Sequence, residues 1–202
     1  MPRPANKDIR TKILNVASTL FFNRGFSRVT ISELVDELRT SKSTIYQNFV
    51  SKEAIVEVLL DEFNAEVDNK LREIVADDSK DFQNKFEEVT AHTCRMLSRV
   101  RRPFFKDLRI HTPELWQRYE KARLKRLDKF YRALFRAGKD QGIIRKDIDI
   151  NFLLLLYTKL TEVLIEPDSL DNFSYSNKMA YKMISKTFLE GAMADGRKRC
   201  KE

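Results

Sequence analysis

Hydrogen-bonding side chains crowd a segment of seven residues, Ser41 to Gln47, that is short enough to form one small helix. At about 100° per residue, placing Ile45 toward a core puts Ser43 and Gln47 nearly opposite it. An outward face of that kind can hydrogen-bond to base edges in the major groove of DNA. The other polar residues of the segment lie on its flanks or in its first turn: Lys42, Thr44 and Tyr46.

The surrounding residues, 29 to 52, contain three helix starts. Thr30, with Glu33 three residues later, fits a capping box. Ser41 and Ser51 stand before the other two starts. Short helices at this spacing predict a helix-turn-helix. Apolar residues at helical spacing allow its helices to pack together: Ile31, Leu34, Val35 and Leu38 on the first, Ile45 and Phe49 on the second.

An amphipathic helix is expected before this motif, from Lys7 to Asn23-Arg24-Gly25, where the glycine can supply a left-handed cap. The three helices together make a head of residues 8 to about 49. Residues 1–6, with two prolines and Arg3, are expected to be a loose basic arm or plain disorder. The expected core of the head is aromatic and aliphatic: Phe21, Phe22, Phe26, Leu34, Leu38, Ile45 and Phe49.

Three stretches of this region form one pattern: Ala17 to Phe26, then Thr30-Ile31, then Ser41 to Phe49 followed by Ser51-Lys52-Glu53. The pattern resembles the N-terminal signature of TetR-family transcriptional regulators over about 50 residues. The resemblance implies that the residues matching Thr30, Tyr46 and Lys52 hold phosphates. It also implies that those matching Ser41 to Thr44 and Gln47 face the major groove.

Two positions depart from the family pattern. Arg39 stands in the turn where the family often has glycine, and Ser43 stands at a second frequent glycine early in the next helix. Arg39 either adds a phosphate contact or sits in a less tight turn, and Ser43 adds a hydroxyl where the backbone would otherwise approach DNA. The predicted DNA-binding residues are Thr30, Arg39, Ser41, Lys42, Ser43, Thr44, Tyr46, Gln47 and Lys52.

The 202-residue chain has a net charge of +8 and a pI of about 9.4, which favours a polyanionic partner without locating it. Residues 1–52 hold nine Lys and Arg against four Asp and Glu, whereas residues 95–136 hold fourteen against four. Charge alone would therefore assign the polyanion to the second stretch. We interpret that stretch as solvated helix faces.

Few residues suit chemistry other than binding. The two cysteines and the two histidines lack metal-ligand spacing, and there is no Gly-rich phosphate loop or Ser-His-Asp set. The sequence therefore predicts no metal, no cofactor and no enzyme activity. No signal-peptide pattern follows Met-Pro-Arg-Pro, and the longest apolar run is Phe152 to Tyr157, so we expect a cytoplasmic protein without a membrane partner.

The pattern of helix signals divides the chain into a helix-turn-helix DNA-binding domain, residues 1–50, and a ligand-binding and dimerisation domain, residues 51–202. The second domain is expected to contain about six helices, so we expect the whole chain to be all-α with about nine helices. A helix capped by Ser51 is expected to reach about Ala76 and to end at the polar residues 77–81. Later helices are expected from Phe82, from Pro103, from Pro113 to before Gly142, from Asp149, and from about Tyr175 to Ala194.

The helix after Asp149 is apolar on every side from Phe152 to Tyr157, and we expect it to be buried on every side. One body can cover only part of such a helix, so a second subunit is expected to cover the rest. Two helices from each chain would form a four-helix interface, as the family resemblance also implies. The predicted dimerisation residues of this two-helix face are Leu156, Leu160, Met179 and Met183.

These signals predict a homodimeric repressor that binds a pseudo-palindromic double-stranded DNA operator and is released by a small hydrophobic effector. The effector rests mainly on the family resemblance. The alternative keeps DNA binding and makes the body only a dimerisation or protein-docking module. Aromatic side chains between residues 82 and 135 line an apolar cavity, with His92 as its polar group, or are ordinary core. The predicted ligand-binding residues are Phe86, His92, Met96, Phe104, Phe105, Trp116 and Tyr119.

Overall fold

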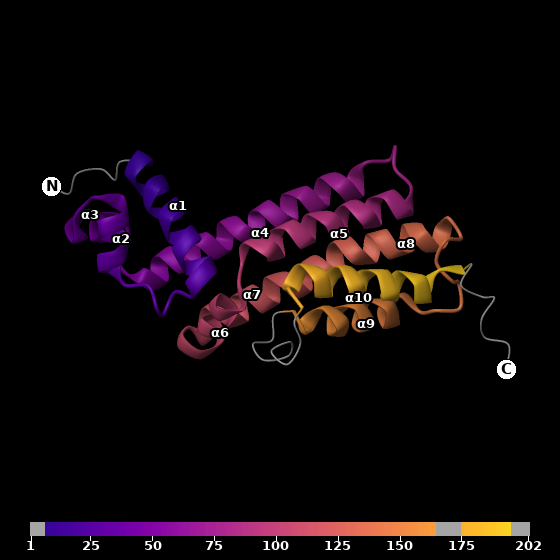
Figure 1. Cartoon of the computed structure of the whole chain (residues 1–202). Helices are drawn as coiled ribbons and strands as arrows, with labels where there is room; N and C mark the ends of the chain where they lie inside the picture. The colour runs from indigo at the N-terminus through magenta and orange to yellow at the C-terminus, as the bar shows by residue number, and fades with distance from the viewer. Residues whose placement is uncertain (1–6, 165–174, 195–202) are drawn as a thin grey trace. The chain divides into compact units, whose positions relative to one another are not determined.

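A computed structural model describes residues 7–164 and 175–194. These residues form an all-α fold (Figure 1), as the sequence predicts. The helices are α1 (Lys7–Arg24), α2 (Ile31–Leu38), α3 (Lys42–Asn48), α4 (Lys52–Ala76), α5 (Phe82–Arg99), α6 (Arg102–His111), α7 (Pro113–Arg126), α8 (Arg132–Asp140), α9 (Ile150–Glu162) and α10 (Asn177–Ala192). The expected N-terminal arm, residues 1–6, and Cys200 lie outside the described residues.

The chain divides into two compact units, each made of two segments. The first unit comprises Met1–Asn64 and Arg99–Tyr119, and the second comprises Ala65–Ser98 and Glu120–Glu202. Both α4 and α7 therefore contribute residues to each unit.

The first unit contains the helix-turn-helix, whose interior is close to the expected core. The buried side chains include Phe21, Phe26, Leu34, Ile45 and Phe49. Leu38 was expected in this core but is only partly buried, because it is the last residue of α2 and lies next to the turn. Val29, which local periodicity did not nominate, is fully buried.

Helix α6 packs on α1 within the same unit. The ring centroids of Phe22 and Phe104 lie 4.9 Å apart, edge to face. The Arg101 N–H, just before α6, donates to the Phe22 carbonyl near the end of α1 at 2.8 Å. The head therefore packs against more of the chain than its own three helices.

The second unit is centred on buried aromatic residues of α8, α9 and α10 and of the turn before α8. The hydroxyls of Tyr131 and Tyr157 each lie within hydrogen-bond distance of the Tyr181 hydroxyl, at 2.9 and 2.7 Å. Burial raises the pKa of Tyr157 and of Tyr181 well above the usual value, so both phenols stay protonated. Because each hydroxyl has a partner, the core holds this polar cluster without an unsatisfied group.

The long helix expected from Pro113 to before Gly142 is interrupted. A π-helical turn, Leu127–Tyr131, separates α7 from α8. A π turn changes the helical phase, and here Leu127, Phe130 and Tyr131 all become buried. Gly142, with φ of +71°, follows the end of α8 as expected.

Helices α9 and α10 contact each other, lying side by side in Figure 1. The Asp149 carboxylate caps α9, accepting from the Asn151 N–H at 2.8 Å. Within one chain α9 is covered only in part, by α8, α10 and the π-helical turn, so the expected cover of its other face by a second subunit stays a prediction. No helix among the described residues is long and apolar enough to cross a membrane.

Candidate nucleic-acid interface

Helix α3 is oriented by one buried side and by its N-cap. Ile45 and Phe49 are buried, which fixes the inward side of this seven-residue helix. The Ser41 side chain accepts from the Thr44 N–H at 3.1 Å, and the two hydroxyls lie 2.9 Å apart. This N-cap satisfies one of the free N–H groups of the first turn and fixes where the helix begins.

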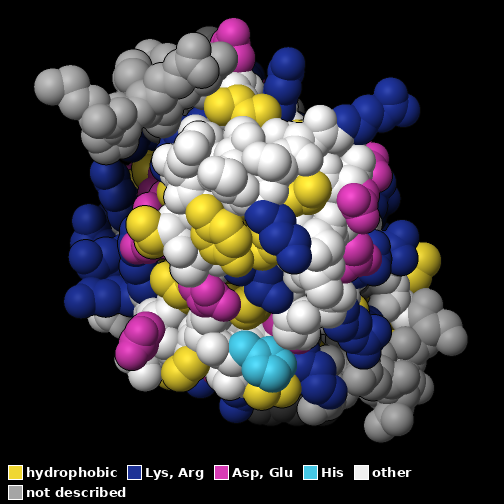
Figure 2. Space-filling model, turned by 90° about the vertical axis from the view of Figure 1, so that its left-hand side faces the viewer, with side chains coloured by type: hydrophobic (Ala, Val, Ile, Leu, Met, Phe, Trp, Pro, Cys, Tyr) yellow, Lys and Arg dark blue, Asp and Glu magenta, His cyan; other side chains and the backbone are white. Residues whose placement is uncertain are grey.

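The outward side of α3 carries the uncharged hydrogen-bonding groups that the sequence placed there. Ser43 and Gln47 are exposed, and the Gln47 Nε2 donates to the Ser43 Oγ at 3.4 Å. Tyr46 is 52% exposed on the flank, and Lys42 is exposed in the first turn. Figure 2 looks onto the side of Figure 1 where α3 lies, and shows uncharged surface interspersed with Lys and Arg and with Asp and Glu side chains.

The turn between α2 and α3 is tight. Arg39 has φ of 49° and ψ of 49°, in the left-handed region. Its N–H donates to the Asp36 carbonyl at 3.2 Å and the Thr40 N–H donates to the Val35 carbonyl at 3.1 Å, which is the Schellman pattern. Of the two alternatives for Arg39, the less tight turn is therefore wrong, and arginine occupies a conformation that favours glycine. Its side chain is exposed.

The start of α2 is a complete capping box. The Glu33 N–H donates to the Thr30 Oγ1 at 3.2 Å, and the Thr30 N–H donates to the Glu33 carboxylate at 2.7 Å. The hydrogen bond from the Thr30 backbone and that from the Arg24 guanidinium lower the pKa of Glu33. The exposed Thr30 hydroxyl thus already serves its own helix at the position predicted to meet a phosphate.

Lys52 has partners within the chain. Its Nζ donates to the Val29 carbonyl at 3.1 Å and lies 5.6 Å from the centroid of the Phe26 ring. The predicted phosphate ligand therefore also holds the turn before α2 onto the start of α4.

One positioning residue that sequence analysis missed is Arg10 of α1. Its Nη1 donates to the Asn48 carbonyl at 2.7 Å, and its guanidinium lies 4.2 Å from the centroid of the Phe49 ring. Arg10 therefore holds the C-terminal end of α3 against α1. The contact spans 38 residues, so local spacing carried no signal for it.

The helix-turn-helix region also matches a family model. Residues 13–59 match the model described as bacterial regulatory proteins, tetR family. The N-terminal part of the chain is therefore similar to the TetR family. The match covers α2, α3, most of α1 and the start of α4, which are the elements that build the interface described above.

Relatives and solved structures extend this likeness beyond the helix-turn-helix region. The chain is 27% identical over 158 residues to the HTH-type transcriptional repressor KstR2 of Rhodococcus jostii, covering 70% of each chain. It is 34% identical over 56 residues to the A-factor receptor protein of Streptomyces griseus, covering 28% of this chain and 20% of that protein.

Among solved structures, a TetR-family transcriptional regulator from Agrobacterium tumefaciens has a TM-score of 0.74 at 14% identity, covering 93% of this chain and 99% of that one. The ketosteroid transcriptional regulator KstR2 of Mycobacterium tuberculosis has a TM-score of 0.63 at 17% identity, covering 96% and 99%. At these identities the likeness shows that the all-α fold is shared.

The predicted ligand-binding residues are divided between the two units. Phe104, Phe105, Trp116 and Tyr119 belong to the first, and Phe86, His92 and Met96 to the second. All seven are buried, as both core and pocket-wall residues would be. In the first unit the Tyr119 ring lies 5.6 Å from Phe105 and 5.8 Å from Trp116.

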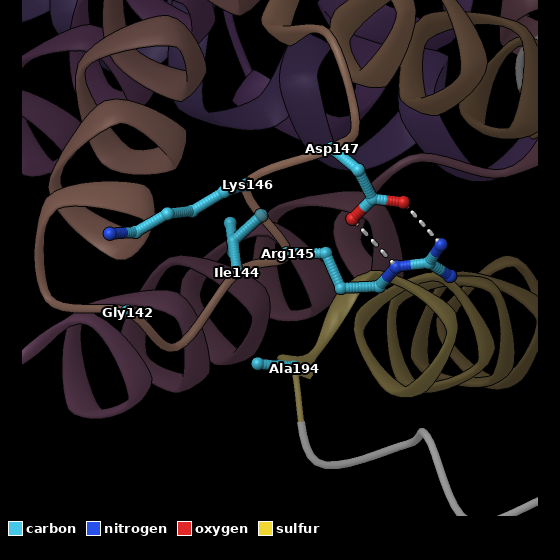
Figure 3. Close-up of a pocket in the computed structure, with 6 residues that line it drawn as sticks. All are labelled: Gly142, Ile144, Arg145, Lys146, Asp147 and Ala194. Carbon is cyan, nitrogen blue, oxygen red and sulfur yellow. Dashed lines mark hydrogen bonds and ion pairs between the residues drawn. The ribbon is translucent and has the colours of Figure 1, made fainter.

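Two hollows lie within single units. One, of about 10 Å³, is lined by Leu60, Leu115 and Tyr119 together with charged residues, and has room for about one water molecule. The other, of about 460 Å³, is open and is lined by Gly142, Ile144, Arg145, Lys146, Asp147 and Ala194 (Figure 3). The side chains of Arg145 and Asp147 are hydrogen-bonded to each other there. The larger hollow contains none of the predicted ligand-binding residues.

The predicted dimerisation residues are exposed apolar side chains on α9 and α10: Leu156, Leu160, Met179 and Met183. The same helices, with the residues just before α10, expose three more that the prediction did not include: Phe152, Leu155 and Tyr175. Leu155 is 57% exposed and Met183 is 50% exposed. We call these seven side chains the apolar α9–α10 face.

Proposed function

We propose that the protein is a homodimeric transcriptional repressor that binds a pseudo-palindromic DNA operator through α3 and is released by a small hydrophobic effector. The observation that carries the DNA-binding part is the outward side of α3, where exposed Ser43 and Gln47 lie opposite buried Ile45. An amide side chain at such a position can form two hydrogen bonds with an adenine edge.

Phosphate contacts on both sides of α3 would set its register on the duplex. The exposed Arg39 side chain and the Tyr46 hydroxyl are assigned to this role, with Thr30 at the N-terminus of α2 and Lys52 at that of α4, while the exposed Lys42 is assigned to the major groove. Ser41 and Thr44 shape the first turn of α3 and complete the set. None of the nine residues is buried.

The apolar α9–α10 face supports the homodimer. Contiguous apolar surface of this kind marks an interaction site, and here it lies on two adjacent helices. A second copy of the same face would cover it in a two-fold, four-helix arrangement. Two-fold symmetry presents two copies of α3, which is why we propose a pseudo-palindromic operator.

The effector part is supported by the buried aromatic side chains and by the relatives. Because KstR2 of M. tuberculosis is described as a ketosteroid transcriptional regulator, steroid-like compounds form the first class of hydrophobic effector to try. The alternative, a body that only dimerises or docks a protein, predicts no such ligand. A compound that changes the emission of Trp116, the single tryptophan, and also lowers operator affinity would distinguish the two.

The DNA-binding part is tested by selecting an operator from a random DNA pool and then measuring the affinity of the Gln47→Ala variant. We expect a loss of about 1 to 3 kcal/mol on the operator and little change on random DNA. Gln83→Ala removes the same amide from an exposed position of α5 and should leave both affinities unchanged. Equal losses for Gln47→Ala on operator and random DNA would show that α3 does not contact the bases.

A further inference from the structure

The turn between α1 and α2, residues 25–29, is held by charged side chains from two other helices of the first unit. From α6, the Asp107 Oδ2 accepts a hydrogen bond from the Ser27 N–H at 2.8 Å. From α4, the Lys52 Nζ donates to the Val29 carbonyl at 3.1 Å. Hydrogen bonds with one ionised partner are stronger than those between neutral groups. The turn is therefore fixed at two backbone groups, the N–H donor of Ser27 and the carbonyl acceptor of Val29.

Asp107 fits into this turn because Gly25 leaves room for it. A Cβ atom at position 25 would lie 2.5 Å from the Asp107 Oδ2 and 3.2 Å from the Pro103 carbonyl oxygen. Gly25 also has φ of +83°, so glycine is favoured there both by the backbone and by the carboxylate. Asp107 is buried, with only 9% of its surface exposed. An acidic side chain in that position acts on the turn and not on DNA.

The side chain at the centre of the turn is held by the same two helices. The buried Phe26 ring lies 6.5 Å from the Phe104 ring of α6, and the Lys52 Nζ lies 5.6 Å from its centroid. A displacement of α6 relative to α1 would therefore move both the backbone and the side chain of the turn.

The turn leads directly into the DNA-binding helices. Thr30, the N-cap of α2, follows Val29, and α2 in turn packs on α3. We propose that Asp107 is a positioning residue for operator binding, which holds the turn at Ser27 and thereby places α3 for the major groove. This inference rests on the proposed DNA-binding function of α3.

Two substitutions of Asp107 separate its hydrogen bond from its charge. Asp107→Ala and Asp107→Asn each remove one negative charge, so both change the electrostatic attraction to DNA equally. Only asparagine keeps a side-chain oxygen that can accept from the Ser27 N–H. We expect Asp107→Ala to lose roughly tenfold or more in operator affinity and Asp107→Asn to stay within about threefold of the unmodified protein. Their affinities for random DNA should be equal.

Helical circular dichroism at the assay temperature establishes that both variants are folded. Equal operator affinities for the two folded variants would overturn the proposal. Amide hydrogen exchange of the unmodified protein supplies a second measurement that needs no variant. A slowly exchanging Ser27 amide is expected, and exchange as fast as that of a solvent-exposed turn would overturn the proposal as well. If no operator can be selected, the proposed function fails, while the exchange measurement still reports on the hydrogen bond between Ser27 and Asp107.

Discussion

Arg39 offers a direct measurement of backbone strain in the turn that positions α3. It is the one described residue other than glycine with a positive φ, and its backbone angles of 49° and 49° are those of a left-handed helix. For a residue with a Cβ atom this conformation costs roughly 1 to 2 kcal/mol. Glycine avoids that cost but loses about 0.4 to 1 kcal/mol through the greater freedom of its unfolded chain. The Arg39→Gly variant should therefore be more stable than Arg39→Ala by about 1 kcal/mol.

Comparing three residues at position 39 separates the backbone from the side chain. Alanine keeps the Cβ atom and the strain but removes the exposed guanidinium, whereas glycine removes both. The stability difference between glycine and alanine measures the strain less the entropic cost of glycine, and that between arginine and alanine measures the side chain. Urea denaturation at one fixed protein concentration is the suitable assay, because the proposed dimerisation would make stability depend on concentration.

The same variants report on the proposed phosphate contact. If the Arg39 guanidinium contacts a phosphate, both variants should weaken binding to operator and random DNA alike and reduce the salt slope by roughly one unit. A glycine variant no more stable than the alanine variant, at equal denaturant slopes, would refute the strain argument. Unchanged salt slopes in both variants would remove Arg39 from the DNA interface and leave the strain argument intact.

Two further predictions concern assembly and pH. Replacing Leu155 or Met183 with glutamate should leave the chain folded and shift the proposed dimer to monomer by light scattering, because each is about half exposed in one chain and would be buried only by the proposed partner. Ile110→Glu, at an exposed position of α6, is the matched control and should stay dimeric. The Ser79 hydroxyl, then Lys80, lower the pKa of Asp77 from 3.8 to about 2. Asp77→Asn should therefore lower the midpoint of urea unfolding at neutral pH, with the difference shrinking as pH falls from about 4 to 2; a difference that persists at pH 2 would contradict this.

Interactions between near neighbours in sequence were predictable. The caps at Thr30, Ser41 and Asp149 each use a backbone N–H two or three residues away, so one short window contains both partners. The inward and outward sides of α3 follow from helix periodicity once Ile45 is placed in the core. For this reason the exposed positions of Ser43 and Gln47 agree with prediction.

Contacts between distant residues were not predictable from spacing. Asp107 and Ser27 are 80 residues apart, and Arg10 and Asn48 are 38 apart. Asp107 did carry a weak signal, as the one acidic residue of the basic helix α6. For Arg39 the sequence left a phosphate contact and a less tight turn open, and the left-handed backbone of Arg39 excludes only the second.

The same limit separates the DNA-binding residues, which lie close together in sequence, from the predicted ligand-binding residues, which do not. The predicted ligand-binding set was chosen by residue type along a stretch of 34 residues, and the structure divides it between two compact units. Burial does not separate a pocket wall from an ordinary core, because both need large apolar side chains. Helix α9 was predictable in part. Its composition required cover on every side, but only the structure shows that Leu153 and Tyr157 face their own chain while Leu155 faces outward, toward the site we propose for the second subunit.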